Sequence, residues 1–290
     1  MAPTLLVLAA GMGSRYGGLK QTDPVGPSGE TMLDYAVFDA VRAGFARVVF
    51  VVGRESEGAF RSSVASKYAG RIASGLVVQA VEDLPDGRVP PPGRIKPWGT
   101  GHAVWCARAA VTGPFAVANA DDFYGASSYA RLSGFLGRAR GPSYAIVGFS
   151  LANTLSESGT VSRGVCRVEG DRLASIVEER AIARSDVGPG RRFSGTEIVS
   201  MNLWGFTPAV FEGLGAGLRA FLEERGRDAE AEFYLPVAVS DLVAAGRATV
   251  EVIASKDRWF GITYRGDRAR AVAAIDDLVR RGSYPRRLFG

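Results

Sequence analysis

Short apolar runs alternate with amphipathic segments through the first half of the chain. The runs have the length and composition of buried strands, and they occupy residues 5–9, 47–52, 76–80, 115–118 and 144–149. Between them, residues 31–43, 55–68 and 102–110 have helical periodicity, and Thr31 and Asp34 have the spacing of a capping box. Repeated strand–helix–strand units predict a mainly parallel sheet with helices on both of its faces.

The second half of the chain follows a different pattern. From about residue 163, apolar and polar positions alternate over residues 164–168, 173–177 and 199–206, which predicts mixed or antiparallel strands added to the same sheet. Residues 232–245 and 267–279 are predicted to be closing helices. The proline-rich stretch 85–97 is interpreted as an ordered loop beside a site. The predicted fold class is α/β, with residues 1–290 forming a single domain.

Composition excludes several classes of function. The net charge of +5 is mild and the basic residues are scattered, whereas a nucleic-acid-binding protein requires a concentrated basic face. A single histidine, His102, argues against a histidine-based metal site and against Ser-His-Asp catalysis. Cys106 and Cys166 lie in apolar runs and are interpreted as small core residues. The first residues lack a basic segment and no apolar run reaches membrane-spanning length, so a cytoplasmic protein without a membrane partner is expected.

A glycine-rich loop follows the first predicted strand directly. Gly11 and Gly13 leave backbone N–H groups free to approach phosphate oxygens, Arg15 adds a forked donor, and Lys20 adds a point charge. A dinucleotide fingerprint is disfavoured because Tyr16 stands where that motif requires glycine. A P-loop is also disfavoured, since its lysine would follow the second glycine without an intervening residue.

Parallel sheets bind ligands at the carboxyl ends of their strands, and the loops after Ala10, Gln79, Asn119 and Gly148 lie at such ends. The Gln79 amide offers both a donor and an acceptor to a base edge, although an ordinary strand-end residue is a close alternative. Asp121 follows a buried strand, and carboxylates in that position suit a magnesium ion.

Three motifs in this order resemble those of the sugar-nucleotide pyrophosphorylases, the nucleoside-triphosphate:sugar-1-phosphate nucleotidyltransferases, which have a Rossmann-like (GT-A-like) fold. They are Ala10-Gly11-Met12-Gly13-Ser14-Arg15 with Lys20 beyond it, Trp98-Gly99-Thr100-Gly101-His102-Ala103, and Asn119-Ala120-Asp121. The resemblance implies that nucleotide contacts come from Ala10, Gly11, Gly13, Gln79, Gly99 and Thr100. It also implies that Arg15 and Lys20 hold the triphosphate and the attacking phosphate. His102 is interpreted as a residue packed beneath the loop.

The resemblance also implies a magnesium site. Asp121 matches the first metal carboxylate of the family, but Gly261 occupies the position of the second. Three alternatives remain open: Asp257 supplies a displaced carboxylate, Asp121 binds the ion alone, or metal-dependent activity has been lost.

The acceptor contacts implied by the resemblance lie in the second half of the chain. They are Gly148 at a strand end, Glu179 and Arg180 in a Glu-Glu-Arg segment, and Asn202 in a later strand. Residues 1–125 would then form a nucleotide-binding half and residues 126–290 an acceptor-binding half.

The expected activity is transfer of a nucleoside monophosphate to a sugar 1-phosphate or related phosphate, with release of pyrophosphate. UTP is the first choice of donor, followed by dTTP and CTP, and Mg²⁺ is the expected cofactor. One alternative is a catalytically impaired homologue that binds nucleotide as a regulatory subunit, which Gly261 favours. The other, a dinucleotide-dependent oxidoreductase, is disfavoured by Tyr16.

Overall fold

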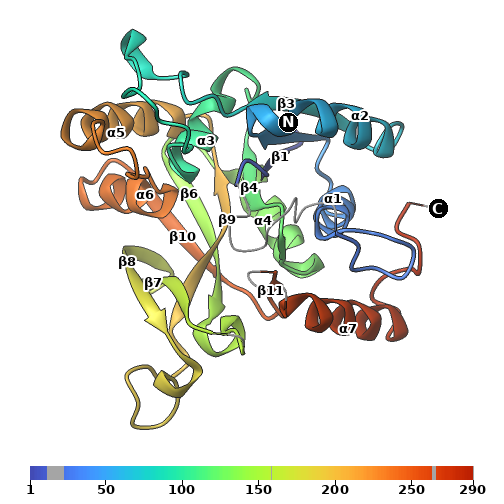
Figure 1. Ribbon diagram of the computed structural model, residues 1–290. Helices are drawn as coiled ribbons and strands as arrows, with labels where there is room; N and C mark the ends of the chain where they lie inside the picture. Colours follow the sequence, from blue (N-terminus) through green and yellow to red (C-terminus); the bar gives the residue numbers. More distant parts are fainter. Residues whose placement is uncertain (12–22, 158, 263–265, 290) are drawn as a thin grey trace.

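The computed structural model describes residues 1–11, 23–157, 159–262 and 266–289 (Figure 1). Within these residues, nine strands form one mixed sheet. In spatial order they are β3 (Ala73–Val78), β2 (Arg47–Val52), β1 (Thr4–Leu8), β4 (Phe115–Asn119), β9 (Ile198–Phe206), β6 (Ser143–Ser150), β10 (Thr249–Ala254), β8 (Arg172–Ile182) and β7 (Val161–Glu169). The first four strands are parallel, and β9 runs antiparallel between β4 and β6. The predicted α/β sheet with an added antiparallel portion is therefore confirmed.

Seven α-helices accompany the strands in the described part of the chain. They are α1 (Met32–Arg42), α2 (Glu57–Lys67), α3 (Thr100–Cys106), α4 (Ala126–Arg138), α5 (Val210–Arg225), α6 (Leu235–Ala244) and α7 (Asp267–Arg280). The predicted capping box is present, because Asp34 N donates to Thr31 Oγ1 and Thr31 N donates to Asp34 Oδ2. None of the described helices is both long and apolar enough to cross a membrane.

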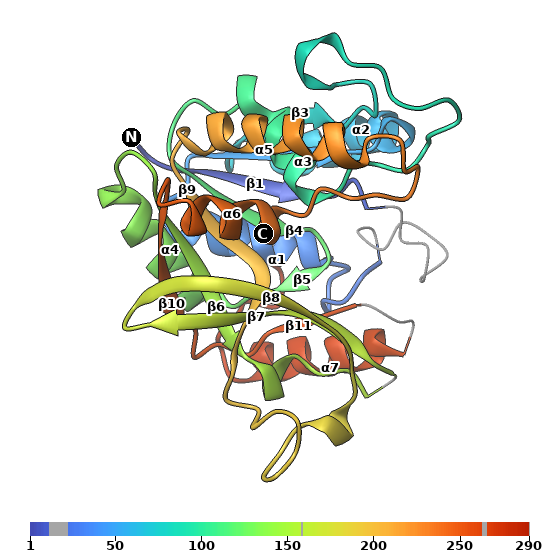
Figure 2. The same ribbon diagram turned by 90° about the vertical axis from the view of Figure 1, so that its left-hand side faces the viewer.

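The sheet has a separate hydrophobic core on each face. Side-chain alternation along β1 sends Leu5 and Val7 to the face covered by α1 and α4, whereas Leu6 points to the face covered by α3, α5 and α6. Both views show α3, α5 and α6 grouped together, apart from α7 (Figures 1 and 2). Burial on both faces explains why the strands are nearly continuous apolar runs.

A third apolar cluster packs α7 and the residues after it against α1. It places Ile275 of α7 and Tyr284 beside Met32 and Tyr35 of α1. A two-stranded sheet of β5 (Asp122–Phe123) and β11 (Phe260–Gly261) borders this cluster, and the rings of Phe123 and Phe260 stack 4.5 Å apart. This small sheet connects the segment after β4 to the segment before α7.

Candidate functional site

The carboxyl ends of the parallel strands meet at one edge of the sheet. Ala9 N donates to Val51 O at 2.8 Å, and Gln79 N donates to Val52 O at 2.8 Å. On the other side of β1, Ala120 N donates to Leu8 O at 3.1 Å. The loops that follow β1, β3 and β4 therefore begin side by side, as the strand pattern predicts. Ala10 and Gly11 lie at this edge, while Gly13, Arg15 and Lys20 lie outside the described residues.

A cleft of about 1290 Å³ adjoins this edge. Among the predicted site residues it brings together Thr100, Asp121, Arg180 and Asn202. Side chains that the sequence did not single out also line it, namely Arg163, Glu178, Tyr234 and Trp259. The cleft thus spans the nucleotide-binding half and the acceptor-binding half as they were predicted from the sequence.

The side-chain amide of Gln79 is buried and forms its hydrogen bonds within the protein. Its Nε2 donates to Gly99 O at 2.9 Å and contacts His102 Nδ1 at 3.1 Å, and the side chain is 5% exposed. His102 Nε2 lies 2.7 Å from Asp83 O, so a neutral imidazole with its proton on Nε2 satisfies both contacts. Burial lowers the pKa of His102, which agrees with a neutral ring. The predicted packing role of His102 is confirmed, and the Gln79 amide braces the Gly99 carbonyl.

The Gly99–Thr100 turn is built so that only glycine fits at its start. Gly99 has φ of +96°, and a Cβ there would lie 2.8 Å from Phe233 O. Gly101 N donates to the same carbonyl at 2.9 Å, and Thr100 Oγ1 accepts from Leu235 N at 3.0 Å. The turn that was predicted to contact the base is therefore held rigidly against the segment leading into α6.

The acidic turn after β4 carries two neighbouring carboxylates that both line the cleft. Asp121 is half-buried, whereas Asp122 is 8% exposed. Asn119 Nδ2 donates to Asp122 Oδ2 at 2.9 Å. Burial, followed by the charge of Asp121, raises the pKa of Asp122 above its ordinary value. Asp121 is the predicted metal ligand. The sequence left open whether the neighbouring Asp122 assists it or faces solvent, and the structure buries Asp122 at the edge of the cleft.

Gly261 lies directly opposite Asp122. The two residues are partners in the β5–β11 pair, and a Cβ built on Gly261 would overlap Asp122 Oδ1. The Asp122 carboxylate therefore occupies the volume that a side chain at position 261 would need. Two adjacent carboxylates and an open cleft fit the ligand set of a magnesium ion, which takes one or two carboxylates together with phosphate and water oxygens. Among the described residues, no group of three or more acidic, histidine or cysteine side chains has the geometry of a metal site.

Asp257 has a structural role that does not support its prediction as a displaced metal ligand. Its Oδ2 accepts from Ser128 N at 2.8 Å and from Ser127 Oγ at 2.7 Å, in the first turn of α4. A Cβ on Gly125 would lie 2.6 Å from that carboxylate, so Asp257 packs tightly against the start of the helix. Orphan N–H groups of a helix N-terminus are satisfied by such contacts. Asp257 therefore caps α4 from a distant part of the chain.

Strand alternation corrects one acceptor assignment. Glu178 and Arg180 of β8 line the cleft, whereas Glu179 between them points to the other face and forms an ion pair with Arg192. Burial raises the pKa of Glu178, and the charges of Arg163 and Arg180 oppose that shift. Since successive side chains of a strand point to opposite faces, a motif match that is shifted by one residue selects the wrong glutamate.

Asn202 and Gly148 occupy two sides of an irregular strand pair. Asn202 has φ of +60° and lines the cleft, and its Oδ1 accepts from Trp204 Nε1 at 3.3 Å. The register of β6 against β9 shifts between Ile146 and Gly148. A Cβ on Gly148 would overlap Ile198 Cγ2, so this glycine is required by close packing between strands. Gly148 supports the acceptor side without lining the cleft.

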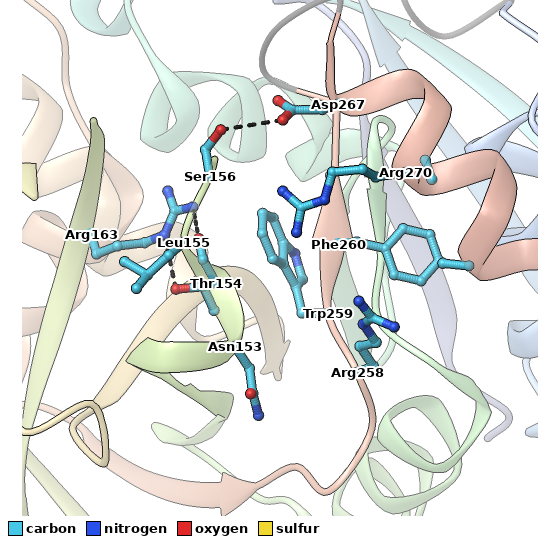
Figure 3. A pocket seen from close by; sticks show the side chains of 13 residues that line it. Asn153, Thr154, Leu155, Ser156, Arg163, Arg258, Trp259, Phe260, Asp267 and Arg270 are labelled. Carbon is cyan, nitrogen blue, oxygen red and sulfur yellow. Dashed lines mark hydrogen bonds between the residues drawn. The ribbon is translucent and has the colours of Figure 1, made fainter. Parts of the chain in front are cut away.

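Arg163 is a fixed positive charge between two cavities. A smaller cavity of about 60 Å³ shares Arg163 and Trp259 with the large cleft. Arg163 Nε donates to Thr154 Oγ1 at 3.1 Å, and across this cavity Ser156 donates to Asp267 at 3.2 Å (Figure 3). Burial lowers the pKa of Arg163 to about 10, so the guanidinium stays charged near neutral pH. β7 also contains Arg167, which pairs with Glu169, so the sequence alone gave no signal that separated Arg163 from it.

Comparison with known proteins agrees with this geometry. The family model described as the MobA-like NTP transferase domain matches residues 5–89. An inositol-1-phosphate CTP transferase from T. maritima superposes with a TM-score of 0.67 at 14% identity, covering 96% of each chain. The chain has a nucleotidyltransferase fold.

Two further structures with this nucleotidyltransferase fold are similar over nearly their whole length. A candidate glucose-1-phosphate thymidylyltransferase from Bacillus anthracis, solved with sucrose, gives a TM-score of 0.66 at 16% identity and covers 95% of this chain and 96% of its own. A UDP-glucose pyrophosphorylase in complex with UDP-glucose gives 0.62 at 18% identity and covers 96% and 99%. No curated protein sequence gives a significant match. The resemblance inferred from the motifs is confirmed by the family model and the fold.

Proposed function

We propose that the chain transfers a nucleoside monophosphate from a nucleoside triphosphate to a sugar 1-phosphate or a related phosphate, releasing pyrophosphate. The observation that carries this proposal is the meeting of three features at one sheet edge. The segment that ends β1 lies beside the end of β4. Thr100, Asp121 and Asp122 line a cleft that continues to Arg180 and Asn202. Such a cleft has room for a triphosphate at one end and a polar acceptor at the other.

The reaction exchanges one phosphorus–oxygen bond for another. An oxygen of the acceptor phosphate forms a bond to the α-phosphorus, and the bond from that phosphorus to the leaving pyrophosphate breaks. A general base is unnecessary because a phosphate monoester is already ionised near neutral pH. The work of the chain is to position the two substrates and to offset their repulsion.

Charged residues divide this work between the two substrates. Arg15 and Lys20, which lie outside the described residues, are proposed to hold the triphosphate. Arg180 is proposed to hold the acceptor phosphate, with Asn202 reading acceptor hydroxyls. Mg²⁺, when bound, supplies charge neutralisation of the phosphate oxygens, and Asp121 is its proposed ligand.

The donor is proposed to be UTP first, then dTTP and CTP. Support for this order comes from the Gly-Thr-Gly-His segment, whose resemblance is to uridylyltransferases. The three similar structures are a candidate thymidylyltransferase, a CTP transferase and a UDP-glucose pyrophosphorylase, so all three pyrimidines occur on this fold.

A matrix of triphosphates against phosphorylated sugars and cyclitols, read out as pyrophosphate, tests the proposal. Pyrophosphate release with at least one pair is expected, and Arg15→Ala is expected to lose most of that rate while keeping the far-UV spectrum of the wild type. Nucleotide binding without release for any pair would favour the alternative, a regulatory homologue without turnover, for which Gly261 is the supporting observation.

A further inference from the structure

The residue opposite Asp122 must be glycine for the Asp122 carboxylate to occupy its present place. Asp122 and Gly261 face one another across β5 and β11, and a Cβ on Gly261 would overlap Asp122 Oδ1. It would also lie 2.8 Å from Trp259 Cζ2, closer than real Cβ contacts. Side chains at positions 122 and 261 would occupy the same volume. The site therefore has room for one carboxylate, either on β5 or on β11.

The contacts of Asp122 leave one oxygen available. Oδ2 accepts from Asn119 Nδ2 at 2.9 Å and lies 3.2 Å from the Tyr124 hydroxyl. Oδ1 has no hydrogen-bond partner in the part of the chain that the structure describes, yet the residue is more than nine-tenths buried and lines the cleft beside Asp121. The Asn119 contact fixes the orientation of the carboxylate, and the remaining oxygen is open to a ligand.

Asp121 and Asp122 place two carboxylates side by side at the edge of the cleft. Two carboxylates on consecutive residues repel one another, and burial of one of them adds a desolvation cost. Arg163 faces Asp122 and offsets part of its charge, but its guanidinium donates to Thr154 and Ser162. A divalent cation that takes oxygen from both carboxylates would remove the repulsion.

We propose that Asp122 is the second magnesium carboxylate of this chain, held by β5 in the volume beside Gly261, the position at which the sequence resemblance implies that carboxylate. This inference rests on the proposed function, in which Asp121 is the first ligand. Asp257 is left to its capping role at α4. Gly261 then marks an exchange of the carboxylate between neighbouring strands rather than a loss of the site.

Binding of Mn²⁺ to the full-length protein, followed by electron paramagnetic resonance with and without UTP, tests this proposal without requiring turnover. Asp122→Gly is expected to weaken Mn²⁺ binding by more than about tenfold, the scale of losing a charge-assisted contact. Asp122→Gly combined with Gly261→Asp is expected to regain most of the affinity, because the carboxylate returns to the same volume from the opposite strand. Asp257→Asn is the matched control, and its Mn²⁺ affinity is expected to equal that of the wild type.

Two results would overturn the proposal: wild-type Mn²⁺ affinity in Asp122→Gly, or no recovery in the double variant when it is folded. If Asp122→Gly does not fold, the nearly isosteric Asp122→Asn replaces it, and unchanged affinity in that folded variant counts equally against the proposal. The pyrophosphate assay distinguishes failure of the Asp122 assignment from failure of the proposed function. If the protein releases pyrophosphate but its Mn²⁺ affinity is unchanged by substitution of Asp122, this inference alone is refuted. If Mn²⁺ affinity depends on Asp122 but no substrate pair gives pyrophosphate, the proposed function alone is refuted.

Discussion

At the scale of single residues, the acidic side chains near the cleft differ in what holds them. Asp121 and Asp122 line the cleft. Asp257 accepts hydrogen bonds from the first turn of α4, and Glu179 forms an ion pair with Arg192 on the opposite face of β8. All four are acidic residues in or beside the segments that resemble family motifs. Only the direction of each side chain separates the residues that can meet a substrate from those that support the fold.

Glu178 and Glu179 form a matched pair for testing that distinction. Glu178→Gln is expected to raise KM for the acceptor by about tenfold, since loss of a hydrogen bond to a charged group costs about 1.5 kcal/mol or more. Glu179→Gln is expected to leave KM within about twofold, because this side chain faces Arg192. Steady-state kinetics with the best substrate pair measures both. Equal effects of the two substitutions would contradict the assignment.

Asp39 is a buried acid away from the cleft, and its environment has a consequence for stability. Its Oδ2 accepts from Tyr284 at 2.6 Å, its Oδ1 is buried without a partner in the described structure, and burial raises its pKa from 3.8 to about 7. The folded protein therefore holds this proton more tightly than the unfolded chain. The stability that Asp39 contributes is complete below its ordinary pKa and is lost as pH rises through about 7.

Replacement of Asp39 by asparagine is expected to remove that pH dependence. The free energy of unfolding of Asp39→Asn, measured in urea, should gain on the wild type between pH 5 and pH 8. The gain should reach a few kcal/mol at most, because one pKa unit corresponds to about 1.4 kcal/mol. Exposed Asp171→Asn serves as the control. Parallel pH profiles for Asp39→Asn and the wild type would show that the carboxyl is not protonated in the folded protein.

The order of the candidate site segments along the chain could be predicted from the sequence. Which side chains point into the cleft could not. Thr100 and Asp121 both line the cleft: the turn containing Thr100 was predicted from a motif resemblance, and Asp121 from its position after a buried strand. Glu178 and Arg163 were missed, since their selection depends on strand register. The role of Asp122 stayed open, because its burial depends on space left by Gly261, more than a hundred positions away.

At the scale of elements, the strands and capped helices were predicted closely, whereas α4, α5 and β10 were not predicted. The helix α4 contains Gly134 and Gly137, and α5 contains Gly213, Gly215 and Gly217. Glycine lowers helix propensity, so the sequence signal is weak in both. In α5 the glycines serve packing, because a Cβ on Gly213 would lie 2.8 Å from Leu242 Cδ1.

Alanine at two of these glycines is expected to have opposite effects. Gly134 is exposed in α4 with nothing within 4 Å of a built Cβ, so Gly134→Ala should stabilise the protein by about 1 kcal/mol through helix propensity. Gly213→Ala gains the same propensity but must displace Leu242 of α6, so it should be neutral or destabilising. Thermal unfolding compares the two. A larger gain for Gly213→Ala would show that α5 and α6 can separate freely.

At the scale of the whole molecule, residues 284–288 pack against α1 and the loop that precedes it. Tyr284 donates to Asp39, Leu288 N donates to Glu30 Oε1 at 3.4 Å, and Ser28 Oγ donates to Arg286 O at 2.9 Å. The sheet also crosses from one predicted half to the other, with β9 between β4 and β6. The two halves share cores, so each depends on the other for its stability.

Removal of residues 283–290 tests that dependence. Tyr284 and Leu288 are 4% and 5% exposed, and burial of such side chains contributes about 1.5–3 kcal/mol each. The truncated chain should therefore lose about 4 kcal/mol of stability in urea unfolding. Arg287→Ala, at an exposed position, should change stability by less than about 0.5 kcal/mol. Unfolding of the truncated chain at the wild-type urea concentration would contradict a stabilising role for this segment.

The position of this segment has a consequence for synthesis. During translation, residues 24–39 emerge from the ribosome long before residues 284–289 exist, so Met32 and Tyr35 lack their apolar covering for most of that time. A nascent chain stalled before residue 284 would expose this apolar surface to chaperones, and the cluster could close only after Tyr284 and Leu288 had emerged.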